Sequence, residues 1–269
     1  MTRSFRDAIT TRRFLVVAHR GASAYAPENT LPAFELACDQ GADVIELDVH
    51  LTRDDEVVVM HDHRVDRTTD GRGEVRALTL REIASLDAGA WFGAAWRGTG
   101  VPTLRDVLDR FAGRVLIDIE IKGGVTSGWR TGGVREDAAA SVRLARRTLE
   151  VVREAGALAR VVIASFGPRA LASVIETCPD VPTQWSVFSR DIAQDCAFAA
   201  QARFDVISPQ AYAATRANVE TAHRHGLAVY IYAGDGDDAT ARVMDSGADA
   251  VKTDRPDRLR ALVAARGRA

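Results

Sequence analysis

The chain has 269 residues, of which 46% are hydrophobic and 27% charged, and its formal net charge is −2 at pH 7. This length suits one large α/β domain or two small ones, and the composition is that of an ordinary globular protein. The balanced charge argues against bulk electrostatic attraction to nucleic acid or to an anionic membrane, although it leaves room for a local basic pocket.

Short apolar, β-branched segments alternate with helical segments along most of the chain. The expected strands are 14–18, 44–49, 57–60, 115–121, 161–164, 183–187, 205–207, 227–232 and 249–252. The expected helices are 30–40, 104–111, 136–155, 168–176, 190–201, 215–225, 237–246 and 256–265. Strand–helix alternation repeated about eight times is typical of a (β/α)8 barrel, and a doubly wound sheet is the competing arrangement. We predict an α/β protein with the TIM (β/α)8 barrel fold.

Residues 51–103 interrupt this alternation between the second barrel strand and its helix. A connection this long without strand–helix alternation is uncommon. We therefore predict one domain spanning 1–269, in which 51–103 is a small insertion that covers the barrel mouth. Within the insertion, a short amphipathic helix is expected over 79–87. Three aromatic residues follow: Trp91, Phe92 and Trp96. They either pack the insertion against the barrel, which is the favoured interpretation, or bind an acyl chain.

The cysteines and the N-terminal segment indicate the cellular compartment in which the protein is expected. The three cysteines have no metal-type spacing and are expected to be reduced packing residues: Cys38, Cys178 and Cys196. The N-terminal segment is charged but lacks the apolar stretch of a signal peptide. No segment approaches the roughly 20 apolar residues of a membrane span. We expect a cytoplasmic protein without a membrane span, and the oligomeric state stays open.

Acidic residues interrupt two of the apolar strands. Glu46 and Asp48 are two residues apart, so on a strand both side chains point to the same face. Like charges on a buried face repel, and a hard divalent cation with oxygen ligands, Mg²⁺ or Ca²⁺, relieves that repulsion. Asp118, Glu120 and Lys122 share one face of a later strand in the same way. Of these, Glu120 is the expected metal ligand, Lys122 is expected to face a substrate anion, and Asp118 is expected to be structural.

Two histidines follow apolar strand segments, where parallel α/β folds place catalytic side chains. Imidazole titrates near neutral pH, so His19 and His61 can act as general base and general acid. Arg20 offers a planar fork suited to phosphate, and Gly21 beside it lets the backbone approach an anion closely. Glu28 is expected among the substrate-binding residues, where it would orient a neighbouring His or Arg or contact the metal. The alternative is that it only assists the cap of the following helix. The other histidines are expected at surface or supporting positions: His50, His63, His223 and His225.

In this order, the motifs resemble those of the glycerophosphodiester phosphodiesterase family over nearly the whole chain. The matching segments are HRG (19–21), PENT (27–30), ExD (46–48), HD (61–62), VDRTT (65–69), VPTL (101–104), IEIK (119–122), SF (165–166) and GADAVKTDRP (247–256). The resemblance implies a TIM barrel with a small insertion after the second strand. It also implies metal-dependent hydrolysis of glycerol-3-phospho-alcohols to sn-glycerol 3-phosphate and the free alcohol. By these motifs the acid–base pair is His19 and His61. The metal ligands are Glu46, Asp48 and Glu120, and the phosphate ligands are Arg20 and Lys122.

The chain departs from this family in the seventh-strand region, where similar members carry a Trp-x-x-Asn stretch. Here 229–234 reads VYIYAG, which keeps an aromatic residue as Tyr230 or Tyr232 and loses the asparagine amide. Recognition of the glycerol or alcohol portion of the substrate is therefore open. The glycine-rich segment 123–133 is expected to be a mobile loop at the barrel mouth, or a connector without substrate contact. In the first case two of its side chains could reach a head group: Trp129 and Arg130.

The expected reaction has one histidine removing a proton and the other protonating the leaving alcohol. The nucleophile is either the 2-hydroxyl of the substrate, acting through a cyclic phosphate, or a water molecule. Two rival functions stay open: a lysophospholipase-D-like phosphodiesterase acting on lysophospholipids, and a non-catalytic phosphodiester-binding barrel. Because a binder has no use for a proton donor and acceptor together, an enzyme is favoured. The expected partner is a small-molecule diester, not a nucleic acid.

Overall fold

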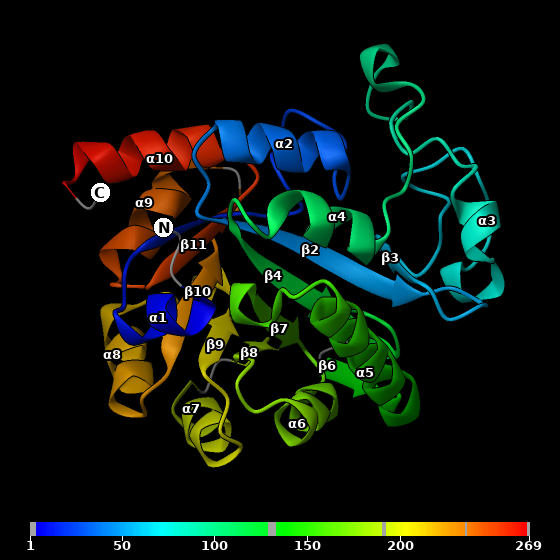
Figure 1. Cartoon of the computed structure of the whole chain (residues 1–269). Coiled ribbons are helices and arrows are strands. Elements are labelled where there is room, and N and C mark those ends of the chain that lie inside the picture. Colours follow the sequence, from blue (N-terminus) through cyan, green and yellow to red (C-terminus); the bar gives the residue numbers. More distant parts are fainter. Residues whose placement is uncertain (1–3, 129–132, 190–191, 235, 268–269) are drawn as a thin grey trace.

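The computed structural model describes residues 4–128, 133–189, 192–234 and 236–267, and it contains a closed barrel of parallel strands (Figure 1). The barrel strands, in spatial order, are β1 (Leu15–Ala18), β2 (Val44–Leu51), β4 (Leu116–Ile121), β7 (Val161–Ser165), β8 (Thr183–Val187), β9 (Val206–Pro209), β10 (Ala228–Tyr232) and β11 (Ala250–Thr253). β1 pairs in parallel with both β2 and β11, which closes the sheet. The predicted TIM barrel is confirmed.

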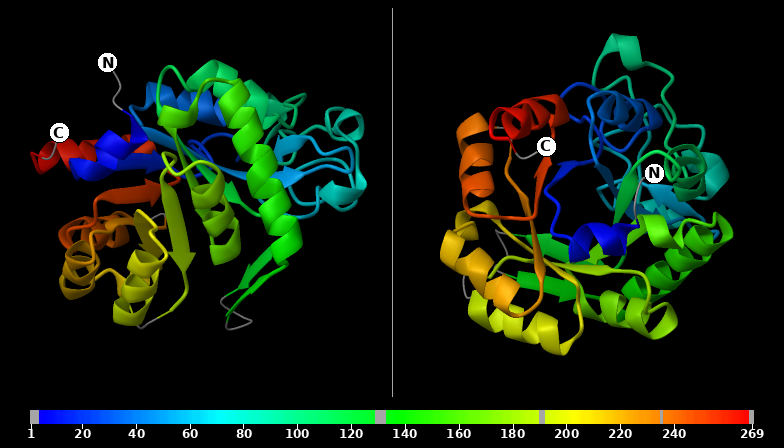
Figure 2. Two further views of the ribbon diagram at one scale, coloured as in Figure 1. Left: turned by 60° about the horizontal axis from the view of Figure 1, so that its bottom comes forward. Right: turned by 60° about the vertical axis from the view of Figure 1, so that its left-hand side comes forward.

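Each barrel strand is followed by a helix, and these helices surround the strands (Figures 1 and 2). They are α2 (Leu31–Asp39), α4 (Leu104–Phe111), α5 (Ala138–Glu154), α6 (Pro168–Thr177), α7 (Ile192–Gln201), α8 (Arg216–Arg224), α9 (Asp237–Asp245) and α10 (Pro256–Ala265). A further short helix, α1 (Phe5–Thr10), was not expected; it packs Phe5 on Tyr230 inside the barrel, with ring centroids 6.4 Å apart. Among the described residues, no helix is long and apolar enough to cross a membrane.

The side chains of β2 and β4 alternate between two environments, as period-2 strand geometry requires. Ile45, Leu47, Ile117 and Ile119 belong to the apolar layer between barrel and helices. Val44 and Leu116 belong to the inner core at the N-terminal end of the barrel. The residues two and four positions further along therefore point into the barrel, nearer its C-terminal end, which we call the mouth. In this parallel register Glu46 lies beside Asp118, and Asp48 lies beside Glu120.

The segment between β2 and α4, the insertion (51–103), begins with β3 (Val57–Val59), which pairs antiparallel with β2. It continues through η1 (Val75–Ala77), α3 (Leu80–Ile83) and η2 (Ala94–Trp96). It has a small apolar core of its own: Val58, Met60, Val65, Val75, Ile83, Ala88 and Val101. The helix expected over 79–87 is only the single turn of α3, because 84–87 leave the helix in a series of turns.

The glycine-rich segment after β4 was expected to be a mobile loop at the barrel mouth or a connector, and part of it has regular secondary structure. It forms an antiparallel hairpin of β5 (Val125–Gly128) and β6 (Gly133–Glu136). Trp129 and Arg130, expected to reach a head group, lie outside the described residues. Gly124 begins the hairpin with φ +74°, and a Cβ there would lie 2.7 Å from the carbonyl oxygen of Asp137. Only glycine suits this approach of the hairpin to the start of α5.

Candidate active site

Three buried carboxylates converge at the barrel mouth. Glu46 and Asp48 come from β2 and Glu120 from β4, and one oxygen of each lies within 4.8 Å of the others. An inward face with three acids forms because the two strands run in register and both carry carboxylates at inward positions. An all-oxygen donor set of this kind fits a hard divalent cation. These residues are therefore the ones that could hold a metal ion.

The electrostatics of the cluster are asymmetric. Burial, reinforced by the negative charge of Asp48, raises the pKa of Glu46 to about 7. Burial also acts to raise the pKa of Asp48, but Lys122 and Arg20 outweigh it and hold that pKa well below its usual range. Lys122 Nζ lies 3.2 Å from Asp48 Oδ1 and 2.5 Å from Glu120 Oε1. Without a cation, the protein's own basic groups therefore compensate part of the repulsion among the acids.

His19 lies just after β1, where its ring is held on two sides. Its Nδ1 is 2.7 Å from Asp254 Oδ1, and its ring centroid is 4.3 Å from that of Tyr232. The Tyr232 hydroxyl donates to Asp254 Oδ2 at 2.9 Å. Of the two tyrosines considered from the sequence, Tyr232 is thus the aromatic residue at the mouth, whereas Tyr230 is buried inside the barrel.

His61 follows β3 and is anchored in the same way. Its Nδ1 lies 2.7 Å from Asp62 Oδ1, and Asp62 in turn accepts from Arg67 Nε at 2.7 Å. His50 Nε2 lies 3.1 Å from the backbone oxygen of His61. His50 is buried, so it holds a supporting position and not a surface one; burial lowers its pKa to about 4.

Arg20 joins the HRG and PENT segments to the carboxylates. Its φ of 56° is left-handed, and its backbone N–H donates to Glu46 Oε2 at 2.9 Å. Its guanidinium donates to Glu28 Oε1 at 2.9 Å and lies 3.4 Å from Asp48 Oδ2. Gly21 is needed here, since a Cβ would lie 2.7 Å from the backbone of Ala33. Glu28 also accepts from Arg67, so this carboxylate binds two arginines and is not a member of the three-acid cluster.

Several supporting residues were missed by the sequence reasoning. Asn29 donates to Asp48 Oδ2 at 2.8 Å, and Asp254 holds His19. Arg67 links Glu28 to Asp62. The available signal was their position inside the recognised motifs: Asn29 in PENT, Arg67 in VDRTT and Asp254 in GADAVKTDRP. Asp118 was expected to be structural, and it forms a buried ion pair with Lys252 at 2.7 Å.

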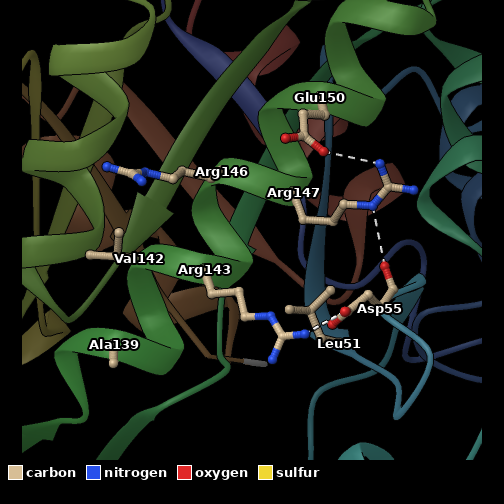
Figure 3. Close-up of a pocket in the computed structure, with 8 residues that line it drawn as sticks. All are labelled: Leu51, Asp55, Ala139, Val142, Arg143, Arg146, Arg147 and Glu150. Carbon is tan, nitrogen blue, oxygen red and sulfur yellow. Dashed lines mark hydrogen bonds and ion pairs between the residues drawn. The ribbon is translucent and has the colours of Figure 1, made fainter.

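The two larger of the cavities found near this end of the barrel, among the described residues, are lined in part by α5. The larger, of about 1030 Å³, starts at His61 and Lys122 and extends between the insertion, β6 and α5. The smaller, of about 350 Å³, lies between α5 and the turn after β2 (Figure 3). In the smaller one Arg143 pairs with Asp55, and Arg147 Nε donates to the backbone oxygen of Asp55 at 3.2 Å. These contacts fasten α5 to the root of the insertion, and the three-acid cluster lies elsewhere.

Comparison with known proteins gives a consistent result. Residues 19–258 match the glycerophosphoryl diester phosphodiesterase family. The chain is 34% identical to a putative glycerophosphodiester phosphodiesterase of Bacillus subtilis over 90% of this chain and 95% of that protein. It is also 34% identical to a glycerophosphodiester phosphodiesterase of Caldanaerobacter subterraneus, over 93% and 97% of the two chains.

Comparison with solved structures gives the same family and fold. The crystal structure of a glycerophosphodiester phosphodiesterase from Agrobacterium tumefaciens is 31% identical with a TM-score of 0.76, covering 92% of this chain and 99% of that one. An Oleispira antarctica phosphodiesterase shares the fold at 24% identity, with a TM-score of 0.83 over 95% of this chain and 99% of that one. The family match spans the motifs that build the three-acid cluster and both anchored histidines. The chain therefore belongs to the glycerophosphoryl diester phosphodiesterase family and is an enzyme of the phosphodiesterase class.

Proposed function

We propose that this enzyme hydrolyses glycerophosphodiesters to sn-glycerol 3-phosphate and a free alcohol, with a divalent cation and a histidine pair. One observation carries the proposal: two carboxylate-anchored imidazoles, His19 and His61, lie at the same end of the barrel as the three-acid cluster. They are close enough for the charge of His19 to act on Glu46 and that of His61 to act on Asp48. Proton-transfer groups beside a cation site are what diester cleavage requires.

The histidines exchange protons through Nε2 in this proposal. Each Nδ1 is engaged by an aspartate, which fixes the ring orientation and favours the tautomer with hydrogen on Nδ1. Nε2 of one ring then accepts the proton of the nucleophile, either the substrate's 2-hydroxyl or a water molecule. Nε2–H of the other ring donates a proton to the leaving alcohol oxygen as the P–O bond breaks. General acid–base help of this kind contributes about 10²- to 10⁴-fold.

The cation, Mg²⁺ or Ca²⁺, would be held by Glu46, Asp48 and Glu120. When bound, it supplies Lewis-acid stabilisation of charge on the phosphoryl oxygens. Arg20 and Lys122 have a second role in this proposal: they bind the substrate phosphate, and Glu28 orients Arg20 from the opposite side. Charge-assisted contacts of an arginine fork suit this role.

A polar diester fits the mouth better than a lysophospholipid does. The larger cavity is lined mainly by charged and polar residues. The aromatic residues of the insertion pack edge-to-face on one another instead, with ring centroids 5.5 Å apart for Trp91–Phe92 and 6.4 Å for Phe92–Trp96. They lie at the turn of the insertion that projects from the barrel (teal-green in Figure 1). None of them is among the described residues that line the cavity.

Two further assignments belong to this proposal. Residues 1–269 act as one phosphodiesterase domain in which 51–103 covers the mouth, supported by the cavity that the insertion shares with β6 and α5. A cytoplasmic location is supported by the three free cysteines, Cys38, Cys178 and Cys196.

The test is hydrolysis of glycerophosphocholine, glycerophosphoethanolamine and glycerophosphoglycerol, with lysophosphatidylcholine alongside. The enzyme is treated with EDTA and then supplied with Mg²⁺ or Ca²⁺. Metal-restored release of glycerol 3-phosphate from the short diesters is expected. Turnover of lysophosphatidylcholine alone would replace the proposal with the lysophospholipase-D-like activity, and turnover of none would leave a binding barrel.

A further inference from the structure

Beside the three-acid cluster, the inward side chains of β7, β8 and β9 are short or neutral. Ala164 is the register partner of Glu120, and Gln184 is in turn the partner of Ala164, so all three face the barrel interior. Ser186 lies two positions further along β8, on the same face and nearer the mouth. Ser208 of β9 is the register partner of Ser186. We call Ala164, Gln184, Ser186 and Ser208 the polar wall.

The two serines of the polar wall differ from the other buried serines of the described chain. Four buried serine hydroxyls donate to protein oxygens: those of Ser141, Ser165, Ser173 and Ser246. Ser186 and Ser208 are only 5% and 8% exposed, yet neither hydroxyl has a hydrogen-bond partner among the described residues. Nearly buried polar groups are normally satisfied by protein, water or a ligand. The polar wall therefore presents two available hydroxyls to the mouth.

Gln184 adds a second, independent observation. Its side chain is fully buried, and neither its amide nitrogen nor its amide oxygen has a hydrogen-bond partner within the described ranges. Side chains of a strand lean along the strand direction, which for β8 is toward the mouth. A carboxamide offers two N–H donors and one carbonyl acceptor, so it can both donate to a hydroxyl group and accept from one. Gln184 is thus an unused donor and acceptor behind the two serines.

The chemistry of the polar wall favours a neutral ligand. The sequences of β7, β8 and β9 contain no charged residue. A phosphate group binds cationic side chains, and the proposed ones, Arg20 and Lys122, belong to the other half of the mouth. A neutral hydroxyl is a donor and an acceptor at once, as are the groups of the polar wall. The ligand expected here is therefore the hydroxyl-bearing end of a polyol.

The position of the polar wall indicates which part of a diester it meets. Ala164 lies beside Glu120, one of the proposed cation ligands, so the wall adjoins the proposed reaction site. The larger cavity begins at His61 and Lys122 and leads away between the insertion, β6 and α5. That cavity has space for alcohols of different sizes. The barrel strands of the wall are fixed by their pairing, which suits the glycerol portion that all substrates of the proposed reaction share.

We propose that the polar wall binds the terminal hydroxyl of the substrate's glycerol portion, with Gln184, Ser186 and Ser208 as specificity-determining residues. This inference rests on the proposed phosphodiesterase function and deepens it, since it assigns the two ends of the diester to different sides of the mouth. A substrate without the terminal hydroxyl would leave these polar groups unpaired. Sites built to hydrogen-bond a hydroxyl discriminate against analogues that lack it for this reason.

The test compares two diesters that differ by one hydroxyl, glycerophosphoethanolamine and its analogue with a 2-hydroxypropyl group in place of the glycerol portion. The analogue keeps the 2-hydroxyl, so both proposed nucleophiles stay available. We expect the metal-loaded wild type to prefer glycerophosphoethanolamine by at least about tenfold in kcat/KM. Gln184→Met, which nearly keeps the side-chain size, and Ser208→Ala should each reduce the preference to about threefold or less, through a loss on glycerophosphoethanolamine.

The matched control is Ser173→Ala. Ser173 has the same 5% exposure as Ser186, but it lies on α6 and its hydroxyl donates to the backbone oxygen of Ala170 at 2.8 Å. This variant removes a buried hydroxyl away from the mouth, so it should keep the wild-type preference between the two substrates. Circular dichroism and thermal melting of the three variants establish that each is folded.

The outcomes separate this inference from the function on which it rests. Equal kcat/KM for the two substrates in the wild type would overturn the inference. Equal losses on both substrates in Gln184→Met and Ser208→Ala would also overturn it, because they mark a structural role. Hydrolysis of glycerophosphoethanolamine without a preference over the analogue refutes only the inference. Failure on every diester, including glycerophosphocholine and glycerophosphoglycerol, refutes the phosphodiesterase function itself.

Discussion

The two halves of the barrel mouth share one backbone architecture and differ in chemistry. The half formed by β11, β1, β2 and β4 carries the three-acid cluster, His19, Arg20 and Lys122. In the half formed by β7–β10, the strand next to Glu120 offers Ala164 at the paired position. There the mouth is walled by Phe166 and Phe188, whose rings stack with centroids 4.7 Å apart.

This division follows from what a buried charge requires. An ionised group away from water costs several kcal/mol unless it is paired. Three of the four inward acids of β2 and β4 pair with a basic side chain: Asp48 with Lys122 and Arg20, Glu120 with Lys122, and Asp118 with Lys252. Charges gathered on adjacent strands can compensate one another, whereas a charge isolated among β7–β10 could not. The neutral half is free to provide a rigid wall.

The largest expected effects come from the charged half. His19→Ala and His61→Ala should each lower kcat by at least about 10²-fold, since each removes one proton-transfer group. Steady-state hydrolysis of glycerophosphoglycerol measures this. Circular dichroism and thermal melting, expected to be close to wild type, establish that the fold is kept. Wild-type activity in either variant would end the acid–base assignment.

The next effect concerns the cation. Asp48→Asn removes one proposed ligand and the anionic partner of Lys122 and Arg20, while leaving the shape of the side chain nearly unchanged. Affinity for Mg²⁺ or Ca²⁺, measured by calorimetry, should fall by at least about tenfold, and activity should fall with it. Asp54→Asn, on the exposed turn after β2, is the control. Equal metal affinity in both variants would exclude Asp48 as a ligand.

The neutral half should respond differently. Phe188→Leu removes a ring stacked on Phe166. The centroid of the Phe166 ring lies 5.9 Å from Lys122 Nζ. Loss of one aromatic pair costs about 0.5–1.5 kcal/mol. We expect KM to rise a few-fold with kcat almost unchanged. A fall in kcat as large as that of the histidine variants would contradict the division between a chemical half and a wall.

Tyr232 lies where the two halves meet, so Tyr232→Phe is a finer test. The variant keeps the ring beside His19 and removes the hydrogen bond to Asp254 Oδ2. With one donor fewer, Asp254 holds the His19 ring less firmly in its orientation. We expect kcat/KM to fall about two- to fivefold, with KM almost unchanged. Wild-type kcat/KM in Tyr232→Phe would show that the hydroxyl has no influence on His19.

The barrel and the core of the site were predictable because both depend on local periodicity. Apolar strands alternating with helices predicted the barrel, and the two-residue spacing of Glu46 and Asp48 predicted a shared face. Long-range partners carry no such local signal: Asp254 meets His19 across 235 positions of the chain, and Lys252 meets Asp118 only because the barrel closes. The β5–β6 hairpin was missed because its glycines predict irregular backbone, and only the contact with α5 shows why they are needed.

The smallest effect on activity is expected at His50, a buried imidazole beneath the charged half. Burial lowers its pKa to about 4, whereas in the unfolded chain it is about 6.5. A group whose folded pKa is depressed contributes stability above its unfolded pKa and loses it as pH falls towards the folded value. Between about pH 6.5 and 4 the wild type should therefore lose on the order of 2 kcal/mol that His50→Gln does not lose. Urea unfolding of both proteins in EDTA across this range measures the difference, and parallel stability curves would show that His50 takes up its proton equally in both states.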